Sequence, residues 1–573
     1  MQNLNETENE IIPAEFGTIE TVGSPPEEKI ILTESQAKHA YKLIRILERF
    51  FISIDSSKMG KGKSIIVIFL ILYMKIKNPV LICLSQLVQM WEKYAEDYGI
   101  NLTVISYDTL RGMGNSENKK VTLNHGYLKR KGDEYSATKS FKRKLATEGC
   151  SFFFDEFHKL KNSGIITTLA VEEICKTIKE TRETLGEHCP KSFLHFFSAT
   201  SMDKTTQCSS FLKMIGIIPH TTLYDNEKIS NSSIFDLKNY CKEIDFETTE
   251  NLWNSHSLGS KSALPIAFDL YTQVIIPNIS SYVEDINSDE NKQSIYYVDQ
   301  RIPERAVKLM QIAEEISKSR YPKISRRSRE KYKKIAGDDE KDLSEMNGPT
   351  HGQVISQIIK THYIIAKEAR RILETVENSK VIIFLDYRGA VNIAAQKLKE
   401  YGVVIIEGRK HLSIKDREKR IEKFQQPNIK KRVLIAISTV GTTGYGLDDI
   451  HGGFPRFVFM NLGNNIINLI QGPGRTERKN TKSKNVTFVV KVYGLETSIE
   501  KNIRQKSSII KKTSRENGVV TPNDFIYLTD LDKKDYNELL RNAGTIQQFE
   551  RLEQKPTSSI CTPQRPTFNS WFD

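Results

Sequence analysis

The stretch "SSKMGKGKS", from Ser56 to Ser64, decides the fold, because it lies between a strand-like apolar run and a helix-like one. The preceding run, "FISID", ends at Asp55, and "SIIVIFLILYM" begins at Ser64. Glycines in such a loop let backbone N–H groups approach a phosphate, and the N-terminus of the following helix adds partial positive charge. We therefore predict a phosphate-binding loop, in which Lys63 reaches the β- and γ-phosphates and the Ser64 hydroxyl binds Mg²⁺.

The spacing of this loop differs from G-x-x-x-x-G-K-[ST], because Ser57 occupies the first glycine position. It follows [AS]-x-x-G-x-G-K-[ST], which is the helicase variant of the loop. A short match of this kind also occurs by chance, so the rest of the chain has to support it. The other loop residues that we expect at the nucleotide are Lys58, Met59, Gly60, Lys61 and Gly62.

Apolar strand-like runs alternate with helical stretches in two blocks, and the region between the blocks is helical and polar. Such alternation predicts parallel sheets with crossover helices, and hence an α/β fold with two lobes and a helical insertion between them. We expect an acidic, disordered leader (1–28), an ATP-binding lobe (29–225), a helical and basic insertion (226–376), a second lobe (377–520) and a C-terminal extension with a disordered tail (521–573).

A pair of carboxylates follows another apolar run in "FFFDEFHKLKN". Asp155 at the end of a strand can hold Mg²⁺ through water, and Glu156 can act as general base for the attacking water. Acidic pairs at strand ends are also common without any catalytic role. The order of the two motifs, first the loop and then the carboxylates, favours the catalytic interpretation.

The segment "QGPGRTERKN", from Gln471 to Asn480, offers Arg475 and Arg478 three residues apart, and so on one helix face. Arginines in this position can neutralise charge on a transferring γ-phosphoryl group. The alternative is a solvated basic helix start. Gln471 and Gly474 complete the pattern Q-x-x-G-R-x-x-R, which is more specific than two arginines alone.

Together these motifs resemble those of superfamily-two DExH-box helicases, most closely the Swi/Snf-type branch of double-strand translocases. The resemblance spans about residues 32–515. Five further segments resemble motifs of that branch in the expected order: "PVLICLSQLVQMWEKYAEDYG", "VISYDTLRG", "VIIFLDYRGAVNIAAQKL", "GRKHLSIKDREKRIEKFQ" and "STVGTTGYGLDD". The resemblance implies two RecA-like lobes that bind ATP and Mg²⁺.

The resemblance also implies a role for individual residues. Gln36 would recognise adenine, while Lys63 and Ser64 would bind phosphate and metal. Asp155 and Glu156 would serve the metal and the water. The residues implied to couple the nucleotide site to the nucleic acid are His158, Ser198, Ala199, Thr200 and Gln471. Those implied at the cleft between the lobes are Gly444, Gly446 and Asp448, with Arg475 and Arg478 as arginine fingers.

Three departures from the Swi/Snf pattern leave the subfamily open. Ser57-Lys58 stands where that branch usually has Asp-Glu, and Asp448 stands where Asn is usual. The Ser-Ala-Thr triplet at 198–200 is the form found in strand-separating helicases, whereas the remodellers more often carry Gly-Thr-Pro. The poxvirus-type nucleoside triphosphatase I is another relative to consider, and a large DNA virus is a possible source.

Composition favours an intracellular, soluble protein with a polyanionic partner. The formal net charge is +13, which suits nucleic acid, although a Lys-rich composition typical of AT-rich genomes is an alternative cause. No run of eighteen apolar residues occurs, so we expect no membrane span. The N-terminus is acidic and has no apolar segment, so we expect no secretory signal there. The seven cysteines have neither zinc-site spacing nor the density of a disulfide-stapled module.

Two further segments suggest partners. Residues 318–334 carry nine Lys or Arg against one acid, so they would contact phosphates, unless they form a solvated loop. The final residues, "PQRPTFNSWFD", resemble a sliding-clamp-binding peptide through Phe568, Trp571 and Phe572, although Arg565 occupies the usual Gln position. The alternative is that the tail packs on its own lobe.

We predict an ATP hydrolase stimulated by nucleic acid: an ATP-dependent DNA helicase or translocase that couples Mg-ATP hydrolysis to movement. An RNA helicase or a transcription-associated nucleoside triphosphatase is the second interpretation. A third, of another class, is a nucleotide-gated clamp or scaffold that binds nucleic acid but barely hydrolyses ATP. DNA versus RNA, strand separation, polarity and oligomeric state are left open by the sequence.

Overall fold

The computed structural model describes residues 16, 18–20, 29–112, 121–160, 165–200, 202–218, 231–256, 263–284, 294–318, 348–408, 412–441, 445–476, 481–483, 485–514 and 521–529. The chain divides into two compact units. We call residues 1–288, 508–519 and 563–573 the N-terminal lobe, and residues 289–507 and 520–562 the C-terminal lobe.

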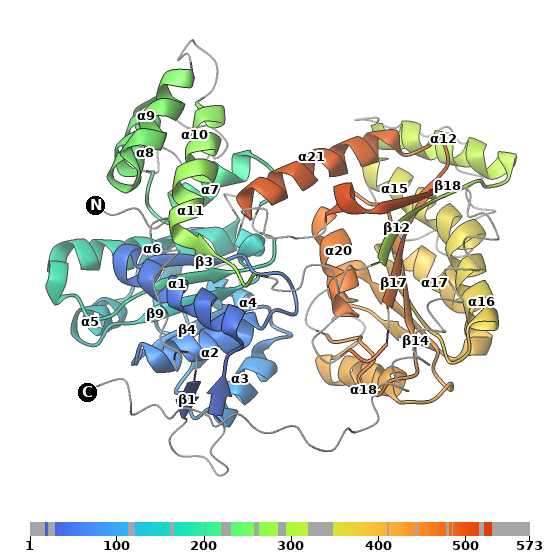
Figure 1. Ribbon diagram of the computed structural model, residues 1–573, viewed down its shortest axis with the longest axis horizontal. Coiled ribbons are helices and arrows are strands. Elements are labelled where there is room, and N and C mark those ends of the chain that lie inside the picture. The colour runs from blue at the N-terminus through green and yellow to red at the C-terminus, as the bar shows by residue number, and fades with distance from the viewer. Residues whose placement is uncertain are drawn as a thin grey trace. The chain divides into compact units, whose positions relative to one another are not determined.

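The N-terminal lobe is built on a parallel sheet with the strand order β11-β3-β10-β9-β4-β5. The strands are β3 (Ile52–Asp55), β4 (Pro79–Cys83), β5 (Thr103–Ser106), β9 (Ser151–Asp155), β10 (Leu194–Phe197) and β11 (Ser280–Ser281). The helices around it are α1 (Glu34–Phe50), α2 (Lys63–Tyr73), α3 (Val88–Asp97), α4 (Tyr107–Arg111), α5 (Lys139–Thr147), α6 (Ile166–Leu185) and α7 (Thr206–Met214) (Figure 1). Strands β3, β4, β5, β9 and β10 coincide with the apolar, strand-like runs of the first block.

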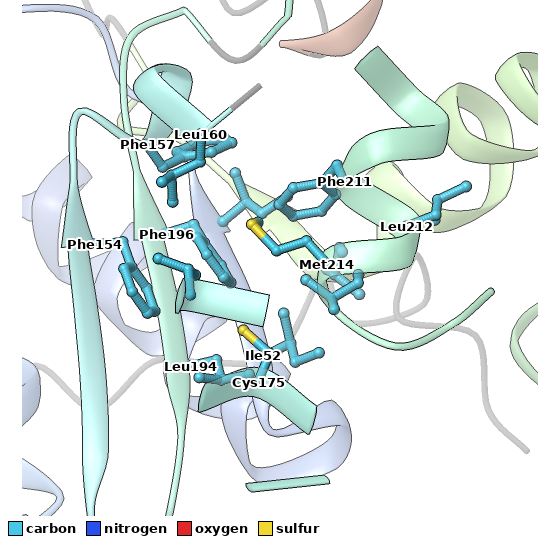
Figure 2. Close-up of a cluster of buried hydrophobic side chains, with 14 of the residues drawn as sticks. Ile52, Phe154, Phe157, Leu160, Cys175, Leu194, Phe196, Phe211, Leu212 and Met214 are labelled. Atoms are coloured by element: carbon cyan, nitrogen blue, oxygen red, sulfur yellow. The ribbon is translucent and has the colours of Figure 1, made fainter. Parts of the chain in front are cut away.

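Both faces of this sheet are covered, which explains why its strands read as continuous apolar runs. On one face Phe154 stacks on Phe196 of the neighbouring strand with 4.7 Å between ring centroids, and Phe211 of α7 meets the edge of Phe196 (Figure 2). Successive side chains of a strand point to opposite faces. Phe153 accordingly packs in a different cluster, which also contains Phe69 of α2.

Smaller elements extend the N-terminal lobe. Strands β6 (Val121–Thr122), β7 (Leu128–Lys131) and β8 (Glu134–Ala137) form an antiparallel sheet in the polar segment between β5 and α5, and β1 (Thr18–Glu20) pairs with β2 (Lys29–Ile31). Helices α8 (Asn231–Ile244), α9 (Phe246–Ser255) and α10 (Leu264–Leu270) stand together as a group (Figure 1). A π-helical turn (Tyr271–Ile275) and α11 (Ile276–Ile279) lead from α10 back to β11.

The C-terminal lobe has a second parallel sheet, ordered β14-β15-β13-β16-β17-β12-β18. Its strands are β12 (Ser294–Gln300), β13 (Lys380–Leu385), β14 (Val403–Ile406), β15 (Val433–Ile437), β16 (Arg456–Asn461), β17 (Asn485–Val492) and β18 (Ile526–Thr529). Its helices are α12 (Glu304–Lys318), α15 (Gly348–Lys360), α16 (Ala366–Thr375), α17 (Arg388–Lys397), α18 (Ile414–Gln425), α19 (Ser438–Gly441) and α20 (Ile466–Gln471). Helix α21 (Thr497–Thr513) begins in this lobe, and its residues from Ser508 onward belong to the N-terminal lobe. The two parallel sheets confirm the predicted α/β fold with two parallel-sheet lobes.

The region 226–376, which we predicted as one helical insertion, is divided between the two lobes at about residue 288. Helices α8 to α11 belong to the N-terminal lobe, whereas α12, α15 and α16 belong to the C-terminal lobe. The expectation that this region is helical is wrong at β11 and at β12. All seven residues of β12 pair in parallel with β17, and four of them, Tyr296 to Asp299, also pair in parallel with β18. Strand β18 likewise lies in the predicted C-terminal extension, so the second sheet reaches beyond residue 520.

Among the described residues, we find no helix with the length and apolarity needed to cross a membrane. The six cysteines in this part of the chain are free thiols: Cys83, Cys150, Cys175, Cys189, Cys208 and Cys241.

Candidate nucleotide site

The predicted phosphate loop joins β3 to α2, as the sequence indicated. Gly60 and Gly62 both have positive φ, 77° and 85°, so left-handed backbone turns the chain into the helix. Gly62 is the N-cap residue of α2, and its carbonyl accepts a hydrogen bond from Ile66 N at 3.1 Å. The first N–H groups of α2 thus lie directly behind the loop, as an anion site at a helix N-terminus requires.

The ammonium group of Lys63 is held by carbonyls of its own loop. Its Nζ donates to the carbonyl oxygen of Ser57 at 2.8 Å and to that of Lys58 at 2.9 Å. The positive charge is therefore kept within the loop, next to the N–H groups of the helix start. The predicted contact between Lys63 and phosphate stays a prediction.

Gln36 contacts the same loop from α1. Its Nε2 donates to the carbonyl of Lys61 at 2.9 Å, and its Oε1 accepts from the backbone N–H of Thr33 at 3.0 Å. Thr33 and Gln36 form the capping box of α1, so the helix start and the loop are tied together. The predicted contact between Gln36 and adenine stays a prediction.

A buried charged cluster lies beneath the loop and was not predicted. Asp55 Oδ1 accepts from Ser57 N at 2.8 Å and lies 3.2 Å from His39 Nε2. Burial would raise the pKa of Asp55, but His39, Lys63 and His195 more than offset it and hold the pKa below its ordinary value. His39 Nδ1 in turn lies 2.9 Å from the Ser281 hydroxyl of β11. No local pattern could reveal this cluster, because Ser281 lies 242 residues beyond His39.

Asp155 is the last residue of β9 and Glu156 follows it, at the same edge of the sheet as the phosphate loop. Strand β10 lies between β3 and β9, and its residue Phe197 is in register with both Asp55 and Asp155. The loop and the carboxylate pair therefore emerge at the same edge of the sheet. Glu156 has φ 53°, a left-handed conformation that is unusual for a residue other than glycine and often marks functional sites.

Glu156, His158 and Ser198 form one hydrogen-bonded cluster. The Ser198 hydroxyl lies 3.1 Å from Glu156 Oε2 and 3.0 Å from His158 Nδ1. His158 Nδ1 itself lies 3.2 Å from Glu156 Oε2. Backbone hydrogen bonds from Glu156 N to Phe197 O and from Ser198 N to Asp55 O fix the cluster to the strand ends. The structure thus brings together Glu156 and two of the residues predicted to couple the sites.

The remaining residues of the Ser-Ala-Thr triplet follow directly. Ala199 and Thr200 are buried, and Thr200 N donates to the Ser198 hydroxyl at 3.3 Å. The triplet therefore forms a tight turn at the end of β10, next to Glu156.

The residues predicted for the second lobe also lie close in the fold. Gln471 ends α20, and Arg475 ends the 3₁₀ turn that follows (Pro473–Arg475); both side chains are buried. The carbonyl of Arg475 accepts from Leu447 N at 2.8 Å, which places the finger segment beside Gly446 and Asp448. Gly444 and Arg478 lie outside the described residues, as do residues 319–334 of the basic segment and Phe568, Trp571 and Phe572 of the tail.

A buried arginine that we did not predict supports this part of the second lobe. Arg456, at the start of β16, donates to the carbonyl of Leu447 at 3.1 Å and to Gln425 Oε1 at 2.8 Å. Gln425 Nε2 donates to the carbonyl of Gly446 at 3.0 Å. Burial lowers the pKa of Arg456 to about 10, partly offset by Asp449 and Asp448. The backbone around Gly446 is therefore fixed by two side chains from neighbouring elements.

Residues 365–480, which include β13 to β16 and Arg475, match the family model of the helicase conserved C-terminal domain. The second lobe therefore contains a helicase-type C-terminal domain. A protein of Acanthamoeba polyphaga mimivirus, named as an ATP-dependent RNA helicase, is 23% identical over 484 residues, which cover 83% of this chain and 81% of that protein.

Two solved helicase-type structures also align with most of the chain. The Sulfolobus solfataricus SWI2/SNF2 ATPase core in complex with dsDNA is 14% identical, with a TM-score of 0.28, and 86% of this chain and 96% of that one are covered. Dbp5 of S. cerevisiae bound to RNA and ADP BeF3 is 13% identical, with a TM-score of 0.37, and the coverage is 89% and 97%.

Proposed function

We propose that the protein is an ATP-dependent DNA translocase or helicase, which couples Mg-ATP hydrolysis to movement along nucleic acid. The observation that carries this proposal is the common edge of the first sheet. Lys63, Asp155 and Glu156 lie at this edge, and Glu156 is hydrogen-bonded in one cluster with His158 and Ser198. These are the group types that a phosphoryl-transfer site needs: a cation for phosphate, a carboxylate for metal and a second carboxylate for water.

The proposed roles follow from the contacts. Lys63 would exchange the carbonyls of Ser57 and Lys58 for the β- and γ-phosphates, next to the N-terminus of α2. Ser64 and Asp155 offer hard oxygen ligands, which suit a Mg²⁺ ion whose other ligands are phosphates and waters. The Mg²⁺ ion would neutralise developing charge on the phosphates. Glu156 would orient the attacking water and accept a proton from it. Ser198 and His158 hold the Glu156 carboxylate in place.

The arginines of the second lobe complete the proposal. Arg475, with Arg478, would stabilise negative charge on the transferring group, as arginine fingers do in related enzymes. The fixed backbone from Gly446 to Asp448, held by Gln425 and Arg456, would keep Arg475 in a reproducible position.

The experiment that tests this function is a steady-state ATPase measurement without nucleic acid and with single-stranded DNA, duplex DNA or RNA. Lys63→Ala is the blank. We expect Mg²⁺-dependent hydrolysis that duplex DNA stimulates most strongly. Absence of hydrolysis under all four conditions would contradict the proposal and favour the nucleotide-gated clamp.

An RNA helicase is the second candidate, and the name of the mimivirus relative favours it. The Ser-Ala-Thr triplet at 198–200 favours it too, because strand-separating helicases use this form. A stimulation by RNA that exceeds stimulation by duplex DNA would select this candidate. A transcription-associated triphosphatase would instead respond to DNA together with its transcription partner.

A further inference from the structure

The indole of Trp91 contacts the carboxylate to which the proposed function assigns the metal. Trp91 lies on α3 and its side chain is fully buried. Its Nε1 donates to Asp155 Oδ2 at 3.0 Å, although 64 residues separate the two in the chain. An indole N–H is only a donor, and a bond to a carboxylate is stronger than one between neutral groups.

We propose that Trp91 is a positioning residue for Asp155, which sets the direction in which this carboxylate faces the metal. The inference rests on the proposed Mg-ATP site. A hydrogen bond to one carboxylate oxygen fixes rotation about the last side-chain torsion, and therefore fixes the direction of the other oxygen. Hydrogen-bonding partners behind a metal ligand typically matter 10- to 100-fold for metal affinity or activity.

Asp155 is held at its main chain as well. The Tyr107 hydroxyl, at the start of α4, donates to the carbonyl of Asp155 at 2.9 Å. Trp91 and Tyr107 thus fix the side chain and the backbone of the same residue from two different helices. This double support distinguishes Asp155 from a carboxylate that merely happens to end a strand.

The alternative is that Trp91 only fills the core, and that its N–H bonds whichever acceptor is near. The ring does have core neighbours, since it meets Tyr94 and Phe197 at 5.8 and 6.0 Å between centroids. The two interpretations differ in what they require of the N–H group. A core residue needs the shape of the ring, whereas a positioning residue needs the donor.

The test replaces Trp91 by 3-benzothienylalanine, which keeps the fused-ring shape and puts sulfur in place of the N–H. The matched control carries the same replacement at Trp253 of α9. Its ring lies under Lys238 Nζ at 4.4 Å, and it has no carboxylate contact among the described residues. The first readout is the Kd of Mn²⁺ in the presence of ADP, measured by electron paramagnetic resonance, which needs no turnover. The second is the Mg²⁺ concentration that gives half-maximal ATP hydrolysis.

We expect the replacement at Trp91 to raise both values roughly tenfold, with a thermal midpoint close to that of the Trp253 control. A conventional variant, Trp91→Phe, should shift both values in the same direction. Values at Trp91 equal to those of the control would overturn the inference, and so would a lower thermal midpoint without a change in the Kd of Mn²⁺.

The outcomes also separate this inference from the proposed function. If the unsubstituted chain binds Mn²⁺ with ADP but hydrolyses no ATP, the proposed function fails, and the Mn²⁺ titration still decides the role of Trp91. If it binds no Mn²⁺ with ADP, both fail.

Discussion

Lys360 and Glu496 form an ion pair inside the C-terminal lobe, with 2.5 Å between Nζ and Oε1 and almost no exposure of either side chain. The pair joins the end of α15 to the turn before α21. Glu496 also lies 3.3 Å from the Ser356 hydroxyl, and its Oε2 accepts from Val492 N at 3.3 Å. These partners compensate part of the desolvation that two buried charges require.

Removing one member of this pair should destabilise the lobe strongly. We expect Glu496→Gln to lower the unfolding free energy by about 3–5 kcal/mol, because the Lys360 charge is left buried without its counter-ion. Chemical denaturation followed by circular dichroism measures the loss. Glu304→Gln is the matched control, because its pair with Lys308 is exposed and should contribute less than about 1 kcal/mol. Equal losses in the two variants would contradict the prediction.

The second prediction concerns pH and the buried His195 of β10. Burial, partly offset by Asp55, lowers its pKa to about 4. In the unfolded chain a histidine titrates near pH 6.5. Between that pH and the lower pKa of the folded state, the unfolded chain binds a proton at this histidine and the folded protein does not. Its contribution to stability is therefore complete above pH 6.5 and declines as the pH falls toward 4, by roughly 3 kcal/mol over this window.

His195→Gln should flatten this pH dependence, because glutamine can still bond the Ser53 hydroxyl, 2.7 Å from His195 Nδ1, and does not titrate. Unfolding free energies at pH 7, 5.5 and 4.5 provide the measurement. His188→Gln is the control, because that side chain is exposed. Parallel pH curves for His195→Gln and the unsubstituted chain would show that another group is responsible.

The third prediction tests the cluster around Glu156. Ser198→Ala removes the hydroxyl that contacts both Glu156 Oε2 and His158 Nδ1. We expect kcat for ATP hydrolysis to fall roughly tenfold while ATP affinity stays unchanged, because the change affects the group that acts on water. The control is Ser209→Ala, a buried serine whose hydroxyl bonds only locally, to the carbonyl of Thr206 at 2.8 Å. An unchanged kcat in Ser198→Ala would remove the hydroxyl from the mechanism.

Most strands of the two sheets could be predicted because buried parallel strands are continuous apolar runs, such as "KVIIFLD" for β13. β11 could not be predicted, because two serines carry no pattern and only their pairing with β3 defines the strand. β12, "SIYYVDQ", does carry β-branched and aromatic residues, but its polar surroundings directed the prediction toward helix. Its place in the sheet depends on β17, which follows almost two hundred residues later in the sequence.

The residues of the candidate site also fall into a group that could be predicted and a group that could not. Lys63, Asp155 and Glu156 could be predicted because their chemistry lies in short contiguous motifs. The partners that hold them could not, because they come from distant elements: Trp91 for Asp155, and His39 for Asp55. Such pairs form only when the tertiary fold brings a buried donor next to a buried acceptor. The spacing of apolar residues along the sequence therefore does not predict them.

The last prediction uses the close approach between Gly62 and Gln36. A Cβ at Gly62 would lie 2.4 Å from Gln36 Nε2, so Gly62→Ala should displace the Gln36 amide and break its bond to the Lys61 carbonyl. Gly126→Ala is a matched control, because Gly126 has a similar positive φ, 78° against 85°, and nothing lies within 4 Å of its added Cβ.

Both variants carry the backbone strain of alanine at positive φ, on the order of 1 kcal/mol. Only Gly62→Ala should also weaken ATP binding, roughly tenfold for a loss of about 1.4 kcal/mol, which titration with a fluorescent ATP analogue measures. Equal ATP affinities in the two variants would mean that the contact between Gln36 and the loop does not shape the nucleotide site.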